Sequence, residues 1–268
     1  MGQDLVDRAI ELMRGQRFGE ALPLLRRVID QDPSQWNAWY MAGQCCRFLN
    51  DIDGAIEHLT RAAELRADQA PVFLALGIAL QLRARWYDAV EAFRRAIEID
   101  PDYGLAYNSL ALTQKNVGEL DKALHNYDSG AKALARRIVN AMRNSPASPI
   151  LKHRDTTGTL WVEHAGYGAL YLVSSAVGVR SMAWPTGEQA LEEERTEKHG
   201  GLYWIDVAND KKETVRLFLP NYFNTFRESL REDSAYANLT GNRGTVLELL
   251  GRHEEARQHF DEATEFLP

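Results

Sequence analysis

Cysteine is scarce in this chain: of 268 residues only Cys45 and Cys46 are cysteines, and they are adjacent. Two neighbouring cysteines cannot form a disulfide framework, so the fold must be held by packing alone. We expect Cys46 to lie between helices as a small buried apolar group. A redox role for the pair is not expected.

The chain also lacks long apolar runs and an excess of basic residues. No run of about 18 apolar residues and no charged leader followed by an apolar stretch is found, so we expect neither a membrane span nor a signal peptide. The 31 Lys and Arg against 38 Asp and Glu give a net charge of −7. This balance makes nucleic acid an unlikely partner. We expect a soluble, cytoplasmic protein.

Catalytic motifs are missing as well: HExxH, GxSxG and a P-loop are absent, and Gly166-Tyr167-Gly168 lacks the third glycine of a dinucleotide fingerprint. Scattered histidines offer the remaining candidates for an acid–base or metal site. They are His153 and His164 with Glu163, and His199 near Asp206. Dispersed histidines are usually surface or hydrogen-bonding groups, so we expect no catalytic residue, no metal site and no cofactor.

What the chain does contain is a repeat. Three sets of residues keep a spacing of 34 without slippage over the first half. They are Ala21, Ala55, Ala89 and Ala123; Ala9, Gly43, Gly77 and Ala111; and Leu25, Leu59, Phe93 and Tyr127. Small residues let two helix backbones approach, and the larger residues fill the space between neighbouring units, so each unit completes its core on the next.

This pattern resembles the tetratricopeptide repeat family, whose units are pairs of antiparallel helices. Repeat 3 matches with Phe73, Gly77, Ala89, Phe93 and Pro101, while repeat 1 departs from the pattern, as an exposed terminal repeat often does. The resemblance covers residues 2 to 137. It implies a mainly α fold, an α-solenoid in which helix pairs form a right-handed superhelix.

The signature returns near the C-terminus. The matching residues are Gly244, Leu247, Ala256, Phe260, Ala263 and Pro268, displaced from repeat 4 by one repeat plus 99 residues. We therefore expect three parts: four repeats over 1–137, an insertion over 138–233, and a fifth repeat over 234–268. Because Gly244, Ala256 and Phe260 are useful only against a neighbouring helix pair, repeat 5 is expected to stack on repeat 4.

The insertion is rich in aromatic residues, which disordered segments lack, so it should fold as a small α/β unit. The helix from Leu120 should end near Arg143, before two prolines. Residues 202–207 and 215–219 predict a β-hairpin, and residues 220–232 a helix. Between 157 and 200 the pattern is ambiguous: 161–179 fits a helix or two strands, and 186–198 a helix that begins with a capping box.

The family geometry places the first helices of successive repeats along a concave groove. By register, repeat 1 contributes Val6, Ile10 and Met13. The predicted peptide-binding residues of repeats 2 to 4 are Tyr40, Gln44, Arg47, Leu74, Ile78, Gln81, Asn108, Leu112 and Lys115. Such a groove suits an amphipathic helix or an extended apolar segment. An equally weighted alternative is that the insertion of the same chain fills the groove.

Chaperone-binding members of the family clamp a C-terminal carboxylate with Lys, Asn and Arg. The corresponding positions here hold Val6, Ile10, Met41, Pro71 and Ala75. That subclass is therefore not expected.

A basic stretch runs from Lys132 to Arg154, with six basic residues and no acidic one. Arg136, Arg137 and Arg143 are the candidates for binding an anion such as phosphate or an acidic peptide. The stronger interpretation is a solvated helix end, where cations interact favourably with the helix dipole. Residues 192–194, three glutamates, are a candidate intramolecular partner.

These observations favour a non-catalytic scaffold for protein–protein interaction, with a protein or peptide partner whose identity the sequence does not give. Self-association into a homo-oligomer stays possible. The alternative from another class is an enzyme or small-ligand-binding module with its site in residues 138–233. A weaker third reading is an anion binder that uses the basic stretch.

Overall fold

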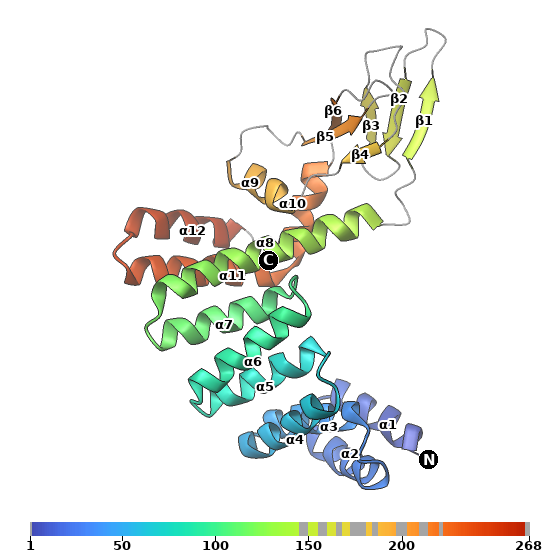
Figure 1. The fold of residues 1–268 in the computed structure, drawn as a ribbon, viewed down its shortest axis with the longest axis vertical. Coiled ribbons are helices and arrows are strands. Elements are labelled where there is room, and N and C mark those ends of the chain that lie inside the picture. Colours follow the sequence, from blue (N-terminus) through green and yellow to red (C-terminus); the bar gives the residue numbers. More distant parts are fainter. Residues whose placement is uncertain are drawn as a thin grey trace. The chain divides into compact units, whose positions relative to one another are not determined.

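The computed structural model describes residues 2–144, 150–154, 160–164, 168–171, 181–183, 187–196, 203–208, 214–219 and 222–265. The chain divides into two compact units, residues 1–130 and residues 131–268 (Figure 1). Helix α8, Leu120–Asn144, begins in the first unit and ends in the second. The second unit holds both the insertion and repeat 5.

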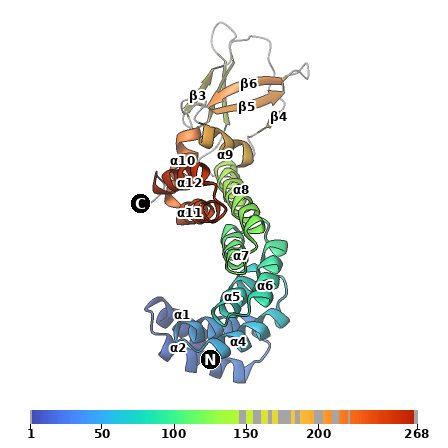
Figure 2. The same cartoon turned by 90° about the vertical axis from the view of Figure 1, so that its left-hand side faces the viewer.

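Four helix pairs build the first unit. Their bounds are α1 Gly2–Arg14 and α2 Phe18–Gln31, α3 Trp36–Phe48 and α4 Ile52–Leu65, α5 Ala70–Leu82 and α6 Trp86–Ile99, and α7 Gly104–Asn116 with the start of α8. First helices and second helices each recur every 34 residues. The register predicted from the sequence is thus confirmed, and Figure 2 shows α5, α6 and α7 lying against one another.

The turn inside each pair repeats as closely as the helices do. Gln16, Asn50, Ala84 and Gly118 all have positive φ, of 58°, 64°, 58° and 83°. This left-handed conformation costs a residue with a Cβ, and glycine or asparagine tolerates it best. Gln16 and Ala84 are therefore the two residues of the four that bear this cost most fully.

Within each repeat, a small residue of the first helix meets a large residue of the second. A Cβ added to Gly77 would lie 2.4 Å from the ring of Phe93, and one added to Gly43 would lie 2.5 Å from Leu59. Ala55 and Ala89 are fully buried on the opposing helices. The pairs can cross this closely only because both contact positions are small.

The second unit contains two small antiparallel sheets. One has β1 Ile150–Arg154, β2 Leu160–His164 and β3 Gly168–Tyr171 in that order, and the other has β4 Ser181–Ala183, β5 Tyr203–Ala208 and β6 Thr214–Leu219. The predicted hairpin is confirmed as the β5–β6 pair, in which Tyr203 lies opposite Leu219. Of the two alternatives for 161–179, the described residues form strands. Strands β1 and β4 were not predicted.

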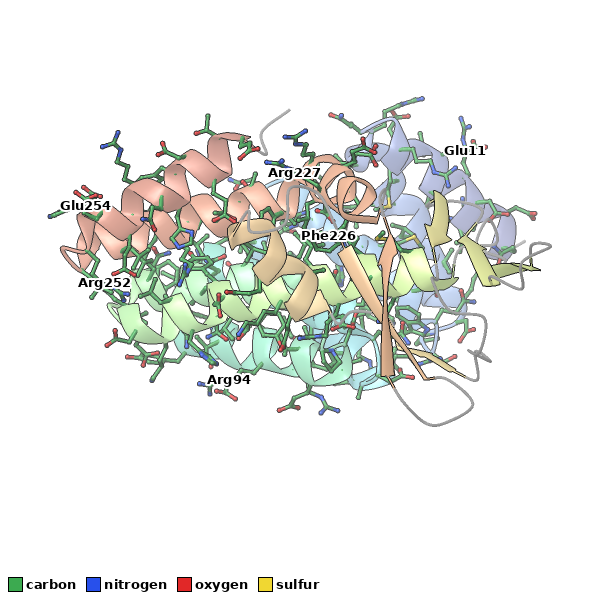
Figure 3. All side chains as sticks on the ribbon, turned by 90° about the horizontal axis from the view of Figure 1, so that it is seen from above. Glu11, Arg94, Phe226, Arg227, Arg252 and Glu254 are labelled. Carbon is green, nitrogen blue, oxygen red and sulfur yellow. The ribbon has the colours of Figure 1, made fainter. Side chains whose placement is uncertain are left out.

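Two helices of the insertion pack against repeat helices of the same unit. Helix α9, Gly187–Thr196, begins so close to α8 that a Cβ on Gly187 would lie 2.1 Å from the backbone of Arg136. Helix α10, Tyr222–Glu232, buries Phe226 fully, while its neighbour Arg227 forms an ion pair with Glu265 (Figure 3). Both helices agree with the sequence prediction, although Thr186 lies outside the described residues.

Repeat 5 consists of α11, Ser234–Leu249, and α12, His253–Glu265. It reproduces the crossing of the other repeats, because a Cβ added to Gly244 would lie 2.8 Å from the ring of Phe260, and Ala256 is fully buried. The helix pair predicted here is confirmed. Its stacking on repeat 4 stays a prediction.

Replacing Ala89 by leucine should destabilise the protein. Ala89 is fully buried between α5 and α6, so the three additional carbon atoms of leucine cannot be accommodated without moving α5 from α6. We expect a loss of about 1–3 kcal/mol in the free energy of unfolding, measured by chemical denaturation. Glu91→Leu, at an exposed position of the same helix, is the control. An unchanged midpoint for Ala89→Leu would mean that the crossing is not close-packed.

Replacing Ala84 by glycine should have the opposite effect. Glycine adopts the left-handed conformation of this turn without the penalty that a Cβ brings, and this relief exceeds its greater loss of chain entropy on folding. We expect a gain of about 0.5–1 kcal/mol in unfolding free energy. Ala67→Gly, exposed and without positive φ, should give no gain. A lower stability for Ala84→Gly would contradict the turn geometry.

Candidate functional site: the inner-helix face

The first helices of successive repeats lie closer together than the second helices do. Helix α3 contacts α5, and α5 contacts α7, whereas α2, α4 and α6 make no contacts of that extent with one another. A hydrogen bond from Gln81 Nε2 to Thr113 Oγ1, 3.2 Å long, also joins α5 to α7. Because the first helices approach each other more closely, they occupy the inner side of the curve of the first unit.

The inner-helix face is the set of half-buried and exposed side chains on these first helices that follow one another at spacings of three or four residues. On α3 it consists of Tyr40, Gln44, Arg47 and Phe48; on α5 of Ile78, Gln81 and Leu82; and on α7 of Leu105, Asn108, Leu112 and Lys115. Eight of the nine predicted residues of repeats 2 to 4 belong to it.

Leu74 is the exception, and its assignment to an open groove was wrong. Only 9% of its surface is exposed, and it belongs to the buried cluster that also holds Ala106 and Leu110 of α7. The register placed it on the first helix correctly. The close approach of α5 and α7 turns this position into core. In repeat 1, Val6 is buried in the same way, while Ile10 and Met13 are half-buried against the core.

The polar side chains of α3 hold one another in place. Gln44 Nε2 donates to Tyr40 Oη at 3.2 Å, and Arg47 Nε donates to Gln44 Oε1 at 3.1 Å. The Arg47 guanidinium also lies over the ring of Phe48, 4.1 Å from its centroid. This chain of contacts fixes the orientation of the guanidinium before anything binds, so less side-chain entropy is lost on binding.

Sequence reasoning missed three large apolar residues of this face. Phe48, Leu82 and Leu105 are 54%, 58% and 48% exposed. A signal was present: Phe48 and Leu82 are separated by one repeat length and follow Gln44 and Ile78 by one helical turn, so they share a face with predicted residues. Their exposure could not be read from the sequence, because the same spacing also fits a core position.

The basic stretch is partly neutralised within its own unit. Arg136 pairs with Glu188 at 3.5 Å, and Arg137 pairs with Asp233, the N-cap residue of α11. The side chain of Arg143 lies outside the described residues. The intramolecular partner of Arg136 on α9 is Glu188, one turn before the predicted glutamates. Ion pairs of this kind reduce the charge that remains for an external anion.

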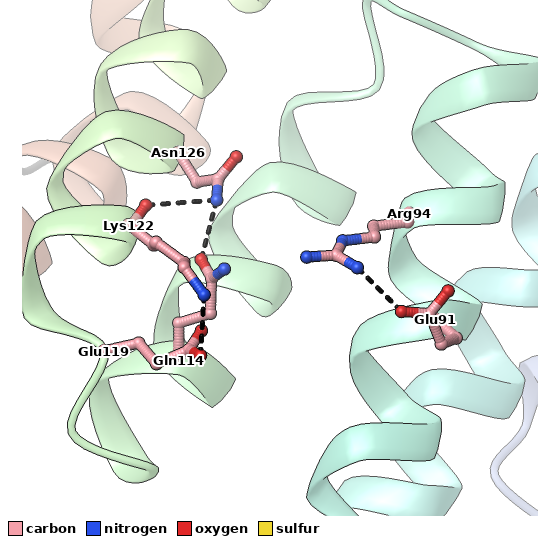
Figure 4. Close-up of polar contacts among 6 residues, drawn as sticks. All are labelled: Glu91, Arg94, Gln114, Glu119, Lys122 and Asn126. Atoms are coloured by element: carbon pink, nitrogen blue, oxygen red, sulfur yellow. Dashed lines mark hydrogen bonds and ion pairs between the residues drawn. The ribbon is translucent and has the colours of Figure 1, made fainter.

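A concavity of about 530 Å³, here called the outer cleft, lies between α6, α7 and α8. At its base the nearly buried Gln114 accepts a 2.6 Å hydrogen bond from Asn126, which also donates to the carbonyl of Lys122 (Figure 4). At its rim Arg94 pairs with Glu91, and Lys122 with Glu119, each at 2.7 Å. Its cations are therefore already paired with carboxylates of the same helix or turn.

Of the candidate histidine sites, the structure describes the backbone of His153, Glu163 and His164 in strands β1 and β2. Strand pairing places His153 opposite Trp161 and His164 opposite Ile150, so the two histidines are not cross-strand partners. No group of three or more His, Cys, Asp or Glu with the geometry of a metal site occurs in the described part of the chain. His199 lies outside it. Within the same described part, no helix is both long and apolar enough to span a membrane.

Cys45 and Cys46 are both completely buried and both carry free thiols. Burial raises the pKa of the Cys45 thiol to about 12. Burial, together with the nearby Asp51 carboxylate, raises that of Cys46 to about 11. A thiol must ionise to act as a nucleophile or a metal ligand, so this pair is suited to packing and not to redox chemistry.

Comparison with known proteins agrees with this architecture. Residues 6–71 and residues 92–125 match two family models, both described as tetratricopeptide repeat. A protein named probable UDP-N-acetylglucosamine–peptide N-acetylglucosaminyltransferase SPINDLY, from Hordeum vulgare, is 24% identical over 146 residues, which are 54% of this chain and 16% of that protein. The chain thus spans only a small part of that relative's length.

Two solved structures are similar to part of this chain. The crystal structure of MamA protein is 23% identical, with a TM-score of 0.47, over 52% of this chain and 77% of that one. YrrB, described as a TPR protein with an unusual peptide-binding site, is 21% identical, with a TM-score of 0.45, over 51% of this chain and 72% of that one.

The family-model matches and the 34-residue register together identify the repeats of this chain as tetratricopeptide repeats. Proteins of this family generally act as scaffolds that bind other proteins or peptides, and their repeats are generally not enzymes.

The buried thiols predict a loss of stability at alkaline pH. Because the pKa of each thiol is raised above its ordinary value of 9.0, the folded state keeps these protons to higher pH than the unfolded state does. Their contribution is complete below about pH 9 and is lost as the pH rises through about 11 to 12. Between about pH 8 and pH 11, the wild type should lose more unfolding free energy than Cys45→Ala/Cys46→Ala. Parallel pH profiles would contradict this.

Proposed function

We propose that this protein is an interaction scaffold whose inner-helix face binds a peptide segment of a partner protein. The observation that carries the proposal is the exposure of Phe48, Leu82 and Leu105 on one face, each at about half or more of its surface. Large apolar side chains that remain exposed along one face of successive repeats favour an interaction surface.

The second helices offer a useful contrast. Their outward side chains form ion pairs within one turn, such as Arg61 with Glu64 at 2.8 Å and Arg95 with Glu98 at 2.9 Å. Such pairs are typical of a solvated surface and contribute little to binding. Tyr87 is 75% exposed on α6 but has no large exposed apolar neighbour at helical spacing on that helix. An isolated residue of this kind needs no partner.

Polar groups on the inner-helix face can form directional hydrogen bonds, which orient a bound peptide in a way that apolar contacts do not. Gln44, Gln81 and Asn108 are half-buried amides, one on each of the helices α3, α5 and α7. An amide side chain can donate to and accept from a peptide backbone at once. Amides that alternate with apolar side chains therefore favour an extended segment lying across the helices.

Two alternatives to peptide binding on the inner-helix face remain to be distinguished by experiment. If the insertion of the same chain covers the face, external peptides will not bind there. The other alternative, an enzyme or small-ligand module in residues 138–233, has no observation among the described residues that favours it, and it stays a prediction.

The proposal is tested by selecting binders from a random peptide display library on the wild-type protein. We expect peptides that bind in fluorescence anisotropy and lose affinity by about tenfold or more on Leu82→Ser/Leu105→Ser, because both side chains contact the peptide. Exposed substitutions usually change stability by under about 0.5 kcal/mol, so thermal melting should be nearly unchanged.

Tyr87→Ser is the matched control, since it removes an exposed aromatic residue from a second helix. It should leave binding unaltered. If no peptide is enriched, or if the enriched peptides bind the inner-face variant as tightly as the wild type, the face is not the binding site.

A further inference from the structure

The inner helices of repeats 2 to 4 differ in charge from every other part of the first unit. Helices α3, α5 and α7 contain no Asp or Glu at all, and their only charged residues are Arg47 and Lys115. Each of the second helices α2, α4 and α6 carries two or three carboxylates. The chain as a whole has more acidic than basic residues. Three helices without any acidic residue are therefore not what this composition leads one to expect.

Burial explains only part of the separation. Helix α5 is largely core and would exclude charge of either sign, but α3 and α7 expose several polar positions. Those positions hold amides and cations, among them Asn37, Asn108 and Asn116. Glutamate is a good helix former and would be favoured at exposed positions if only helix stability mattered. The terminal helix α1 does carry acidic residues, and it lies outside this set.

The two cations are also available for binding. Within the described residues, neither Arg47 nor Lys115 forms an ion pair, whereas Arg83 pairs with Asp53 at 2.9 Å and Arg85 with Asp88 at 2.7 Å. The Arg47 guanidinium is held by Gln44 and Phe48, neither of which neutralises it. A half-buried cation without a counter-ion binds a carboxylate more strongly than an exposed, paired one does.

Arg47 and Lys115 occupy the same register position in repeats 2 and 4, with Gln81 between them in repeat 3. They therefore form a row across the helices: cation, amide, cation. Neighbouring helices pack about 8–10 Å apart, so the two cations are separated by roughly 16–20 Å. An extended peptide covers that distance in about five or six residues.

We propose, on the basis of the function proposed above, that the partner is an extended apolar peptide segment with two carboxylate side chains about five or six residues apart. One carboxylate pairs with Arg47 and the other with Lys115. The apolar residues between them lie on Ile78, Leu82 and Leu112, and Gln81 hydrogen-bonds the intervening backbone. Charge complementarity selects the partner, and the absence of carboxylates on the face removes repulsion against it.

The library selection is repeated on Arg47→Glu/Lys115→Glu and on the matched control Arg61→Glu/Arg94→Glu, which reverses two cations of the second helices. Peptides selected on the wild type and on the control should be enriched in Asp and Glu at the stated spacing, and those selected on the inner variant in Lys and Arg. A wild-type peptide should bind the inner variant at least about a hundredfold more weakly, since two charge-assisted contacts are lost.

The neutral variant Arg47→Gln/Lys115→Gln keeps the size of both side chains and should weaken binding by about tenfold or more without reversing the preference. Circular dichroism melting checks that each variant is folded. Peptides that bind the face without acidic enrichment, or that bind all three variants equally, overturn this inference while leaving the proposed function standing. The absence of any face-dependent peptide overturns the proposed function itself.

Discussion

The contact between a small residue on one helix and a large residue on the other determines how every repeat of this protein is built. Gly43 against Leu59, Gly77 against Phe93 and Gly244 against Phe260 leave no room for a further carbon atom. Because the same contact recurs at a constant spacing, each pair has the same crossing geometry and presents the same face to its neighbour. The tight turn, with its left-handed residue at a fixed position in each pair, follows from that geometry.

The same constraint separates two surfaces with different chemistry. Large residues such as Phe93 and Tyr127 point inward from the second helices and leave the outer side to charged residues that pair among themselves. The first helices, packed closely in a row, are left with a strip of half-buried amides, two cations and exposed apolar side chains. The helix crossings therefore contribute most of the stability of the fold. The side chains of the inner-helix face contribute less to stability and can vary without disrupting the repeats.

The sequence predicted the repeats well because their signal is periodic and each match supports the next. It also predicted the β5–β6 hairpin, where β-branched and aromatic residues flank a polar turn. It failed at strand β1, because Lys152, His153 and Arg154 resemble a basic surface segment. Leu74 and Leu82 show the limit for the site: both lie on α5 at helical spacing from Ile78, yet one is buried and the other exposed. That difference in burial depends on how closely α5 approaches α7. The local sequence pattern carries no information about this distance.

The most direct test of this account is methyl NMR of the protein titrated with a peptide selected on it. Binding to the inner-helix face should shift the methyl signals of Ile78, Leu82 and Leu112, with no comparable change at Ile97, which lines the outer cleft. Shifts centred on Ile97, or on residues of the second unit with Ile78 and Leu112 unmoved, would contradict the central claim that the first helices form the recognition surface.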